Sequence, residues 1–170
     1  MQPSAPSASA EPLTRAQQAV VDDVLQRLRD LPGALLPMLH AIQEQLGFVP
    51  PAAEADLAAA LNLSRAEVHG VVTFYHDFRR VPPGRTVLKL CRAEACQAMG
   101  CRVLEERLAT VHGASMGSTT ADGALTVEPV YCLGNCALAP ALQVDGALKG
   151  RVDVQALDRL VAAARAKGAR

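Results

Sequence analysis

The sequence predicts an α/β protein in which a small N-terminal helical bundle is followed by an α/β domain. The first half spaces its apolar residues as amphipathic helices do, whereas from Thr86 onward β-rich segments alternate with helical ones. The pattern changes at residues 82–84 (Pro-Pro-Gly), which neither a helix nor a strand readily continues through. We therefore expect a disordered tail over residues 1–13, a helical unit over residues 14–83 and a mixed domain over residues 84–170.

Composition and charge exclude several classes of protein. The chain of 170 residues has 17 lysines and arginines against 17 aspartates and glutamates. Nucleic-acid and membrane-surface binders carry a basic excess, so we expect neither partner. The longest uncharged stretch, residues 129–144, is too short and too interrupted by prolines to cross a bilayer, and residues 1–14 lack the features of a secretory signal. We therefore expect a cytoplasmic protein with no direct membrane insertion.

The balanced total conceals an uneven distribution of charge. Residues 1–63 carry three basic and seven acidic groups, whereas residues 149–170 carry six basic and two acidic groups. The last helix that we expect is therefore basic. Either a solvated face or a face that docks a partner explains this charge.

Four helices are expected in the helical unit. Thr14 is placed to cap the first, Gly47 to end the second, and a short alanine-rich third helix ends near Leu61. Ser64, with Glu67 three residues later, forms the capping box of the fourth. The expected apolar stripes of the first two helices are Val21, Val24, Leu25 and Leu28, and then Leu35, Leu39, Ile42 and Leu46.

The fourth helix is expected to continue to the prolines at position 82. It would contain three of the five aromatic residues of the chain, namely Phe74, Tyr75 and Phe78. We expect these side chains to anchor the core of the helical unit or its contact with the second half. The alternative is a partner-binding surface, since bulky aromatics often supply interface anchors.

The sequence pattern of the second half predicts its elements in the order strand, helix, strand, hairpin, helix. Residues 86–90 and 124–130 are β-rich, and each leads toward a cysteine, while residues 97–112 have helical periodicity. Residues 145–146 (Asp-Gly) give a hairpin turn, and Asp153 caps the final helix. This order is typical of an α/β or α+β domain.

The most informative feature is the spacing of four cysteines. Cys91 and Cys96 are separated by four residues, and Cys132 and Cys136 by three. Two loops at the end of a sheet would offer four thiolates to one centre. Structural zinc sites prefer closer Cys-x2-Cys pairs, whereas iron–sulfur proteins also use a Cys-x4-Cys step. The spacing favours an iron–sulfur cluster, with a zinc site, a disulfide or free thiols as alternatives.

A fifth cysteine, Cys101, complicates the count because it repeats the four-residue step after Cys96. We expect it to lie inside the following helix and to pack as a small apolar residue. Spacing alone also allows a four-iron cluster that uses three of the five thiols. The peptide N–H groups that we expect to point at the sulfurs are those of Ala93, Ala95, Leu133 and Gly134.

No other motif in the chain indicates catalysis. The four histidines form no zinc motif, no glycine-rich nucleotide-binding motif occurs, and residues 117–123 are interpreted as a loop. No arrangement of nucleophile and base is visible, so no catalytic residue is assigned. The sequence predicts a protein that carries electrons and leaves the transformation of a substrate to another chain.

Residues 91–96 (Cys-Arg-Ala-Glu-Ala-Cys) and 132–136 (Cys-Leu-Gly-Asn-Cys) resemble a known family. This family comprises the thioredoxin-like [2Fe–2S] ferredoxin subunits that accompany flavin-containing NADH-oxidising modules. Its members include the small cluster subunit of respiratory complex I, its counterpart in NAD-reducing hydrogenases and the gamma subunit of NAD-dependent formate dehydrogenases. The likeness extends to residues 74–75 (Phe-Tyr), 119–123 and 128–134.

The resemblance implies a thioredoxin-like domain after the helical unit and one [2Fe–2S] cluster bound by Cys91, Cys96, Cys132 and Cys136. Cys101 matches no ligand position of the family. The residues between and after the first two cysteines are most similar to the formate dehydrogenase gamma subunit. Asn135, where complex I subunits often have alanine, indicates the same subfamily.

The function that the resemblance implies is electron transfer within a cytoplasmic, multi-subunit NAD-dependent formate dehydrogenase. The cluster would exchange single electrons with the FMN of a flavin- and NAD-binding partner subunit. A molybdenum or tungsten cofactor would lie on a further, catalytic subunit. The alternatives are the equivalent small subunit of complex I or of an NAD-reducing hydrogenase, and, more remotely, a zinc-stabilised interaction module.

Overall fold

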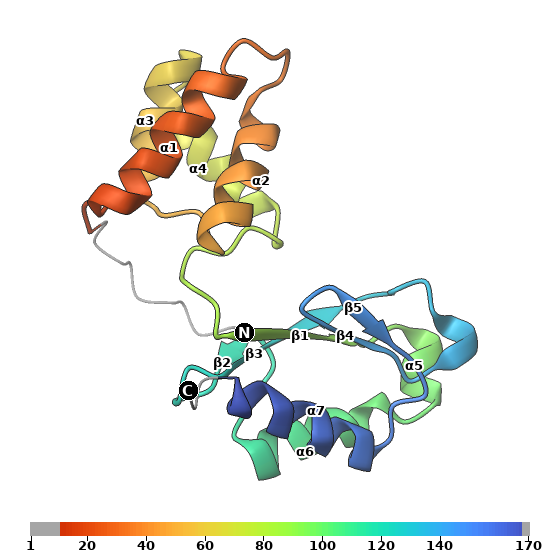
Figure 1. The fold of residues 1–170 in the computed structure, drawn as a ribbon. Helices are drawn as coiled ribbons and strands as arrows, with labels where there is room; N and C mark the ends of the chain where they lie inside the picture. Colours follow the sequence, from red (N-terminus) through yellow and green to blue (C-terminus); the bar gives the residue numbers. More distant parts are fainter. Residues whose placement is uncertain (1–10, 168–170) are drawn as a thin grey trace. The chain divides into compact units, whose positions relative to one another are not determined.

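The computed structural model describes residues 11–167, so most of the predicted tail, residues 1–10, lies outside the described residues. The chain forms two compact units that divide between Pro82 and Pro83 (Figure 1). Among the residues described, no helix is both long and apolar enough to cross a membrane.

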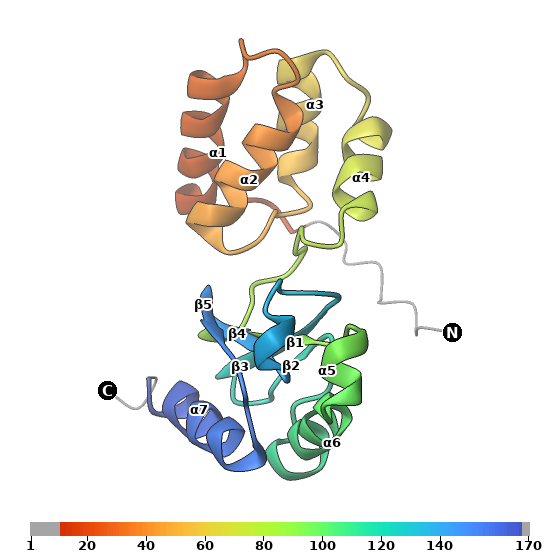
Figure 2. The same cartoon turned by 90° about the vertical axis from the view of Figure 1, so that its right-hand side faces the viewer.

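The N-terminal unit contains the four predicted helices (Figure 2). They are α1 (Arg15–Leu28), α2 (Leu35–Leu46), α3 (Ala53–Leu61) and α4 (Arg65–Phe74). Their apolar faces meet in one core, and each fully buried aliphatic side chain stabilises it by about 1.5–3 kcal/mol. The buried residues of this core are Val21, Val24, Ala34, Met38, Leu39, Ile42, Val49, Ala53, Leu57, Ala58, Val68, Val72 and Phe78.

The predicted helix boundaries of this unit are confirmed where a local signal sets them. Thr14 Oγ1 accepts a hydrogen bond from the N–H of Gln17, whose side chain accepts one from the N–H of Thr14. Ser64 and Glu67 form the same reciprocal pair at the start of α4. Gly47 ends α2 with a φ of 81°, a left-handed conformation that costs glycine little.

The predicted extent of the fourth helix is wrong, because α4 ends at Phe74. Beyond this point a side chain of α2 holds the backbone in a non-helical path. Gln43 Nε2 donates to the carbonyl of Asp77 at 2.7 Å, and Gln43 Oε1 accepts from the N–H of Arg79 at 2.7 Å. The carbonyl of Arg79 in turn accepts from the N–H of Val49 at 2.7 Å. These tertiary hydrogen bonds outweigh the helical periodicity of the segment.

The three aromatic residues consequently have different environments. Phe78 is buried in the helical core, with its ring centroid 5.0 Å from that of His40. Phe74 is 73% exposed and Tyr75 is 44% exposed, and their rings meet edge to face. Anchoring of the helical core is therefore confirmed for Phe78, whereas Phe74 and Tyr75 lie outside the buried core of the unit.

The second unit is a five-stranded sheet in the order β2-β3-β1-β4-β5. Its centre is the parallel pair β1 (Thr86–Cys91) and β3 (Leu125–Val130), joined through a helical crossover. The other strands are antiparallel to their neighbours: β2 (Ser118–Thr119), β4 (Leu142–Val144) and β5 (Ala147–Lys149).

Two helices, α6 (Cys101–His112) and α7 (Val154–Ala166), lie side by side against one face of this sheet (Figures 1 and 2). Arg107 of α6 joins them through two hydrogen bonds to Asp158 of α7. The core between helices and sheet is aliphatic. Its buried residues are Leu88, Leu90, Leu104, Leu108, Ala114, Leu125, Val127, Leu142, Val152, Leu157, Val161 and Ala164.

The predicted hairpin turn and the predicted cap of the final helix are both confirmed. Asp145 and Gly146 have φ values of 46° and 86°, as a two-residue turn between β4 and β5 requires. Asp153 caps α7 by accepting a hydrogen bond from the N–H of Ala156 at 2.7 Å.

Two details of the second unit differ from the prediction. The single helix expected over residues 97–112 is two helices, α5 (Glu94–Ala98) and α6, because Gly100 adopts a φ of 92° between them. The expected loop over residues 117–123 contains β2, which pairs with the edge of β3. Two-residue strands leave no periodic pattern in a sequence, so β2 was not predictable from it.

Candidate metal centre

The two cysteine pairs lie at the carboxyl ends of neighbouring strands. Cys91 is the last residue of β1 and faces Val130, the last residue of β3, in the parallel register. Cys132 follows Val130 by two residues, Cys96 lies in α5, and Cys136 begins the short 3-10 helix η1 (Cys136–Leu138). Parallel strands end at the same edge of a sheet, so this register brings the two loops together.

The outer pair of thiols has the spacing of two ligands on one metal ion. Cys132 Sγ and Cys136 Sγ are 3.9 Å apart and exposed. A disulfide requires about 2.0 Å. A tetrahedral ion with metal–sulfur bonds of about 2.3 Å places two sulfurs about 3.8 Å apart. The separation of the pair is therefore compatible with two ligands on one ion and not with a disulfide.

The inner pair is buried. Cys91 and Cys96 are each 2% exposed and pack with Cys101, Ala139 and Ala141 in a small cluster of their own. The centre therefore has a buried half, formed by the first loop, and an exposed half, formed by the second.

Backbone donors from both loops reach the Cys91 sulfur. Burial raises the pKa of the Cys91 thiol, but N–H groups of Ala93, Leu133 and Cys132, together with the Cys96 thiol, outweigh it and lower the pKa overall. Leu133 and Cys132 belong to the second loop. These N–H groups of the second loop therefore stabilise negative charge on a sulfur of the first loop.

The partner thiols show the opposite behaviour. Burial raises the pKa of Cys96 to about 11, and the adjacent Cys91 adds to the shift. The Cys132 thiol raises the pKa of Cys136. In each pair, negative charge on one sulfur disfavours negative charge on the other, because like charges repel at this distance. A metal cation bound by both sulfurs would offset this repulsion, and its binding would release both protons.

The second loop carries backbone strain at a cysteine. Cys132 has a φ of 126°, in the left-handed half of conformational space that disfavours residues with a side chain. Gly134 follows with a φ of 72° and donates its N–H to Cys132 Sγ at 3.3 Å. Such strain persists only where the surroundings impose it, and it is concentrated at functional sites.

The four thiols are arranged as two pairs, which is the arrangement that a group with two metal ions uses. Across residues 11–167, no three cysteine, histidine or carboxylate side chains converge on one ion position. A structural zinc site takes four ligands around one ion. A group with two metal ions takes two thiols at each, and the cysteines here are arranged in two pairs.

Cys101, predicted to pack, is 1% exposed at the start of α6. Burial raises the pKa of its thiol, and Glu105 adds to that shift. The two arginines beside the first loop are each held by a neighbouring side chain. Arg92 Nε lies 3.0 Å from Glu105 Oε2, and Arg102 donates to Gln97 Oε1 at 2.9 Å.

Three of the four predicted backbone donors are found, namely those of Ala93, Leu133 and Gly134. Two donors were missed: the N–H of Cys132, directed at Cys91, and that of Ala141, directed at Cys96. Spacing within one loop does not reveal either, because both contacts depend on how separate segments pair.

Four thiols presented by two loops at one end of a mixed sheet define a class of protein, an α/β domain with a candidate metal centre formed by cysteines. Within this class, the chain belongs to the thioredoxin-like [2Fe–2S] ferredoxin family, whose model matches residues 21–165. The predicted family and the thioredoxin-like domain are thereby confirmed.

Relatives are similar over nearly their full length, and both of those compared are subunits of an NADH-quinone oxidoreductase. The chain is 32% identical over 151 residues to the relative from Pseudomonas aeruginosa, covering 89% of this chain and 91% of the relative. It is 35% identical over 146 residues to the relative from Rhizobium meliloti, covering 86% of this chain and 87% of the relative.

A solved structure of an NAD+-reducing [NiFe]-hydrogenase in the H2-reduced state is also similar. The TM-score is 0.67 at 28% identity, over 78% of this chain. The match covers only 22% of the hydrogenase chain, so this chain corresponds to a small part of that protein.

Proposed function

We propose that this chain is an electron-transfer subunit that carries one [2Fe–2S] cluster on Cys91, Cys96, Cys132 and Cys136. The observation that carries the proposal is the meeting of two thiol pairs, with N–H groups of the second loop directed at a sulfur of the first. When bound, the cluster supplies a one-electron redox couple. Family membership supports this choice of cofactor.

Two of the four cysteines would bind each iron. Cys132 and Cys136, 3.9 Å apart, would hold the exposed iron, and the buried Cys91 and Cys96 would hold the other. Two ferric ions, two sulfides and four thiolates carry a formal charge of −2, which becomes −3 on reduction. The backbone N–H groups at the Cys91 and Cys132 sulfurs stabilise that charge.

The electron donor or acceptor that we propose is the FMN of a flavin- and NAD-binding partner subunit. The flavin exchanges a hydride with NAD as an electron pair, whereas the cluster accepts single electrons. The exposed side of the centre, at Cys132 and Cys136, is the side that a partner can approach. We place the complex in the cytoplasm.

For the parent complex we propose an NAD-dependent formate dehydrogenase. Support comes from residues 92–95 (Arg-Ala-Glu-Ala) and Asn135, which resemble the gamma subunit of that enzyme. Formate oxidation would then take place at a molybdenum or tungsten cofactor on another subunit. The second candidate is complex I or an NAD-reducing hydrogenase, which the names of the relatives favour.

Two measurements test these proposals. The purified chain should be coloured and contain two irons and two acid-labile sulfides; a colourless chain with one zinc and no sulfide would instead indicate the zinc-stabilised module. Isolation of the chain with its natural partners should yield a complex in which formate reduces NAD. If hydrogen reduces NAD, or NADH reduces a quinone, the electron-transfer role stands and the formate assignment is wrong.

A further inference from the structure

Gly150, the first residue after β5, packs directly on the turn that carries Cys136. A Cβ atom at this position would lie 2.6 Å from Leu138 Cβ, 2.7 Å from Asn135 Nδ2 and 2.9 Å from the Leu138 carbonyl oxygen. Non-bonded carbon atoms rest at about 3.5–4.0 Å, so no side chain fits unless the turn moves. The φ of Gly150 is not in the left-handed range, so the requirement is for space alone.

The residues that Gly150 touches flank a proposed ligand. Asn135 precedes Cys136, and Leu138 follows it by two residues at the end of η1. The N–H of Leu138 donates to the carbonyl of Asn135 at 3.0 Å and closes this turn. A displacement of the turn by contact at either residue is therefore transmitted to Cys136.

Backbone hydrogen bonds fix the same two segments together. The N–H of Arg151 donates to the carbonyl of Leu138 at 2.6 Å, and the N–H of Val152 donates to the carbonyl of Pro140 at 3.0 Å. Gly150 immediately precedes Arg151, and its missing side chain leaves space for the turn beside these bonds.

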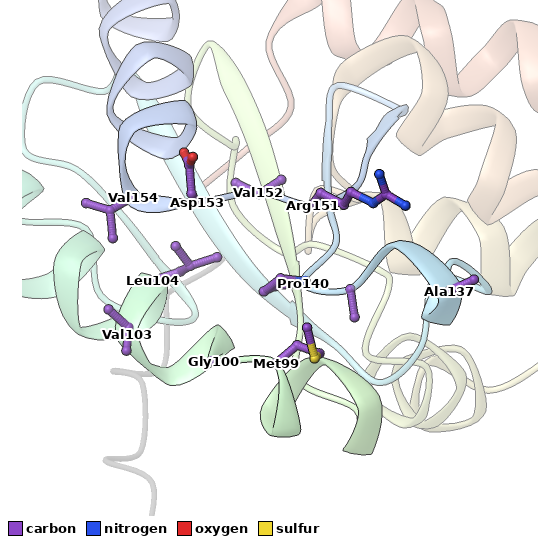
Figure 3. A pocket seen from close by; sticks show the side chains of 11 residues that line it. Met99, Gly100, Val103, Leu104, Ala137, Pro140, Arg151, Val152, Asp153 and Val154 are labelled. Carbon is purple, nitrogen blue, oxygen red and sulfur yellow. The ribbon is translucent and has the colours of Figure 1, made fainter.

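A pocket lies beside the turn. The pocket has a volume of about 660 Å³ and is lined by Ala137 and Pro140 on one side and by Arg151 and Val152 on the other (Figure 3). The turn is therefore not packed on every side.

We infer that Gly150 is a positioning residue for the cluster, holding Cys136 at bonding distance from the iron it shares with Cys132. This inference rests on the proposed [2Fe–2S] function. Residues that support a metal ligand from outside typically change metal affinity by about 10- to 100-fold when replaced.

The test is Gly150→Ala in the full chain with its cluster. We expect about tenfold faster loss of visible absorbance in the presence of an iron chelator, together with altered EPR g-values in the reduced state. Gly70→Ala is the matched control, because within the described residues Gly70 is the glycine with open space around its Cα and a φ outside the left-handed range. It should retain the wild-type EPR spectrum and chelation rate.

A compensating variant separates positioning from a general loss of stability. In Leu138→Gly/Gly150→Ala, the closest colliding atom, Leu138 Cβ, is absent. We expect this double variant to recover part of the wild-type EPR signature even though Leu138→Gly alone destabilises the fold. Thermal unfolding of every variant, monitored by far-UV circular dichroism, accompanies the spectra.

Three results would overturn the inference. These are wild-type EPR and chelation rates in Gly150→Ala, a lowered melting temperature with an unchanged EPR spectrum, or no recovery in the double variant. A wild-type chain that binds no iron or sulfide would refute the proposed function instead, before any variant is compared.

Discussion

The N–H of Leu133 lowers the pKa of the Cys91 thiol, so the backbone of the second loop stabilises a thiolate of the first. The parallel register of β1 and β3, in which Cys91 faces Val130, sets this contact. Each loop alone presents only two thiols. The sheet therefore builds the site by joining two loops that lie far apart in the sequence.

Serine substitutions test the ligand set. We expect Cys91→Ser, Cys96→Ser, Cys132→Ser and Cys136→Ser to lose or alter the cluster, since a hydroxyl is a poorer ligand for iron than a thiolate. The checks are iron and sulfide content and the visible spectrum.

Cys101→Ser provides the contrast to these variants. It places a hydroxyl at a site that is 1% exposed, which lowers stability by about 1–3 kcal/mol if the hydroxyl finds no partner. We expect its cluster to remain. If this variant bleached as strongly as the other four, the proposed ligand set would be incorrect.

The sequence predicts this fold best where a short segment contains its own signal. Thr14 with Gln17, Gly47, and Asp145 with Gly146 determine their local structure through neighbouring atoms, and those elements are found as predicted. The end of α4 depends on Gln43, which binds the backbone of Asp77 and Arg79 from another helix. No local pattern encodes that contact.

The same distinction applies to the candidate site. Spacing alone predicted that the cysteines come as two pairs, because each pair lies within one loop. The contacts between loops depend on strand register, and the role of Gly150 depends on how the β4–β5 hairpin returns to the turn at Leu138. A glycine near a hairpin is too common in sequences to indicate such a contact.

Phe78 and Phe74 offer a test of the helical unit. Phe78→Ala removes a buried ring from the core and should lower the free energy of unfolding by about 3–5 kcal/mol. Phe74→Ala removes a ring that is 73% exposed and should change it by less than about 0.5 kcal/mol. Urea unfolding of the two variants measures both values. Equal losses would mean that Phe74 has a packing role that its exposure does not reveal.

The lowered pKa of Asp158 predicts that the stability of the fold depends on pH. Hydrogen bonds from Arg107 and His112 lower the pKa of this carboxyl to about 2, below its ordinary value of about 3.9. Because the pKa is lower in the folded state, the stabilisation is complete above about pH 4 and is lost as the pH falls toward 2. Asp158→Asn should therefore melt at a lower temperature than wild type at pH 7.

The difference between Asp158→Asn and wild type should shrink between pH 4 and pH 2, as the native carboxyl becomes protonated. Asp30→Asn is the control, since the Asp30 side chain is 92% exposed and lies 3.7 Å from Arg29. Its melting temperature should follow that of wild type at every pH. A difference for Asp158→Asn that persists at pH 2 would show that shape, and not charge, stabilises this contact.

The backbone conformation of Cys132 predicts that the second loop is strained in the absence of metal. At its φ of 126° an alanine is strained and a glycine is not, so metal-free Cys132→Gly should be more stable than metal-free Cys132→Ala by about 1 kcal/mol. Cys136, which begins η1 without a positive φ, is the matched control: there glycine should be less stable than alanine by about 0.5–1 kcal/mol. Urea unfolding of the four metal-free variants measures both differences. The same sign at both positions would refute the strain at Cys132, whereas opposite signs would show that this loop is held in its ligand-binding conformation before any metal is bound.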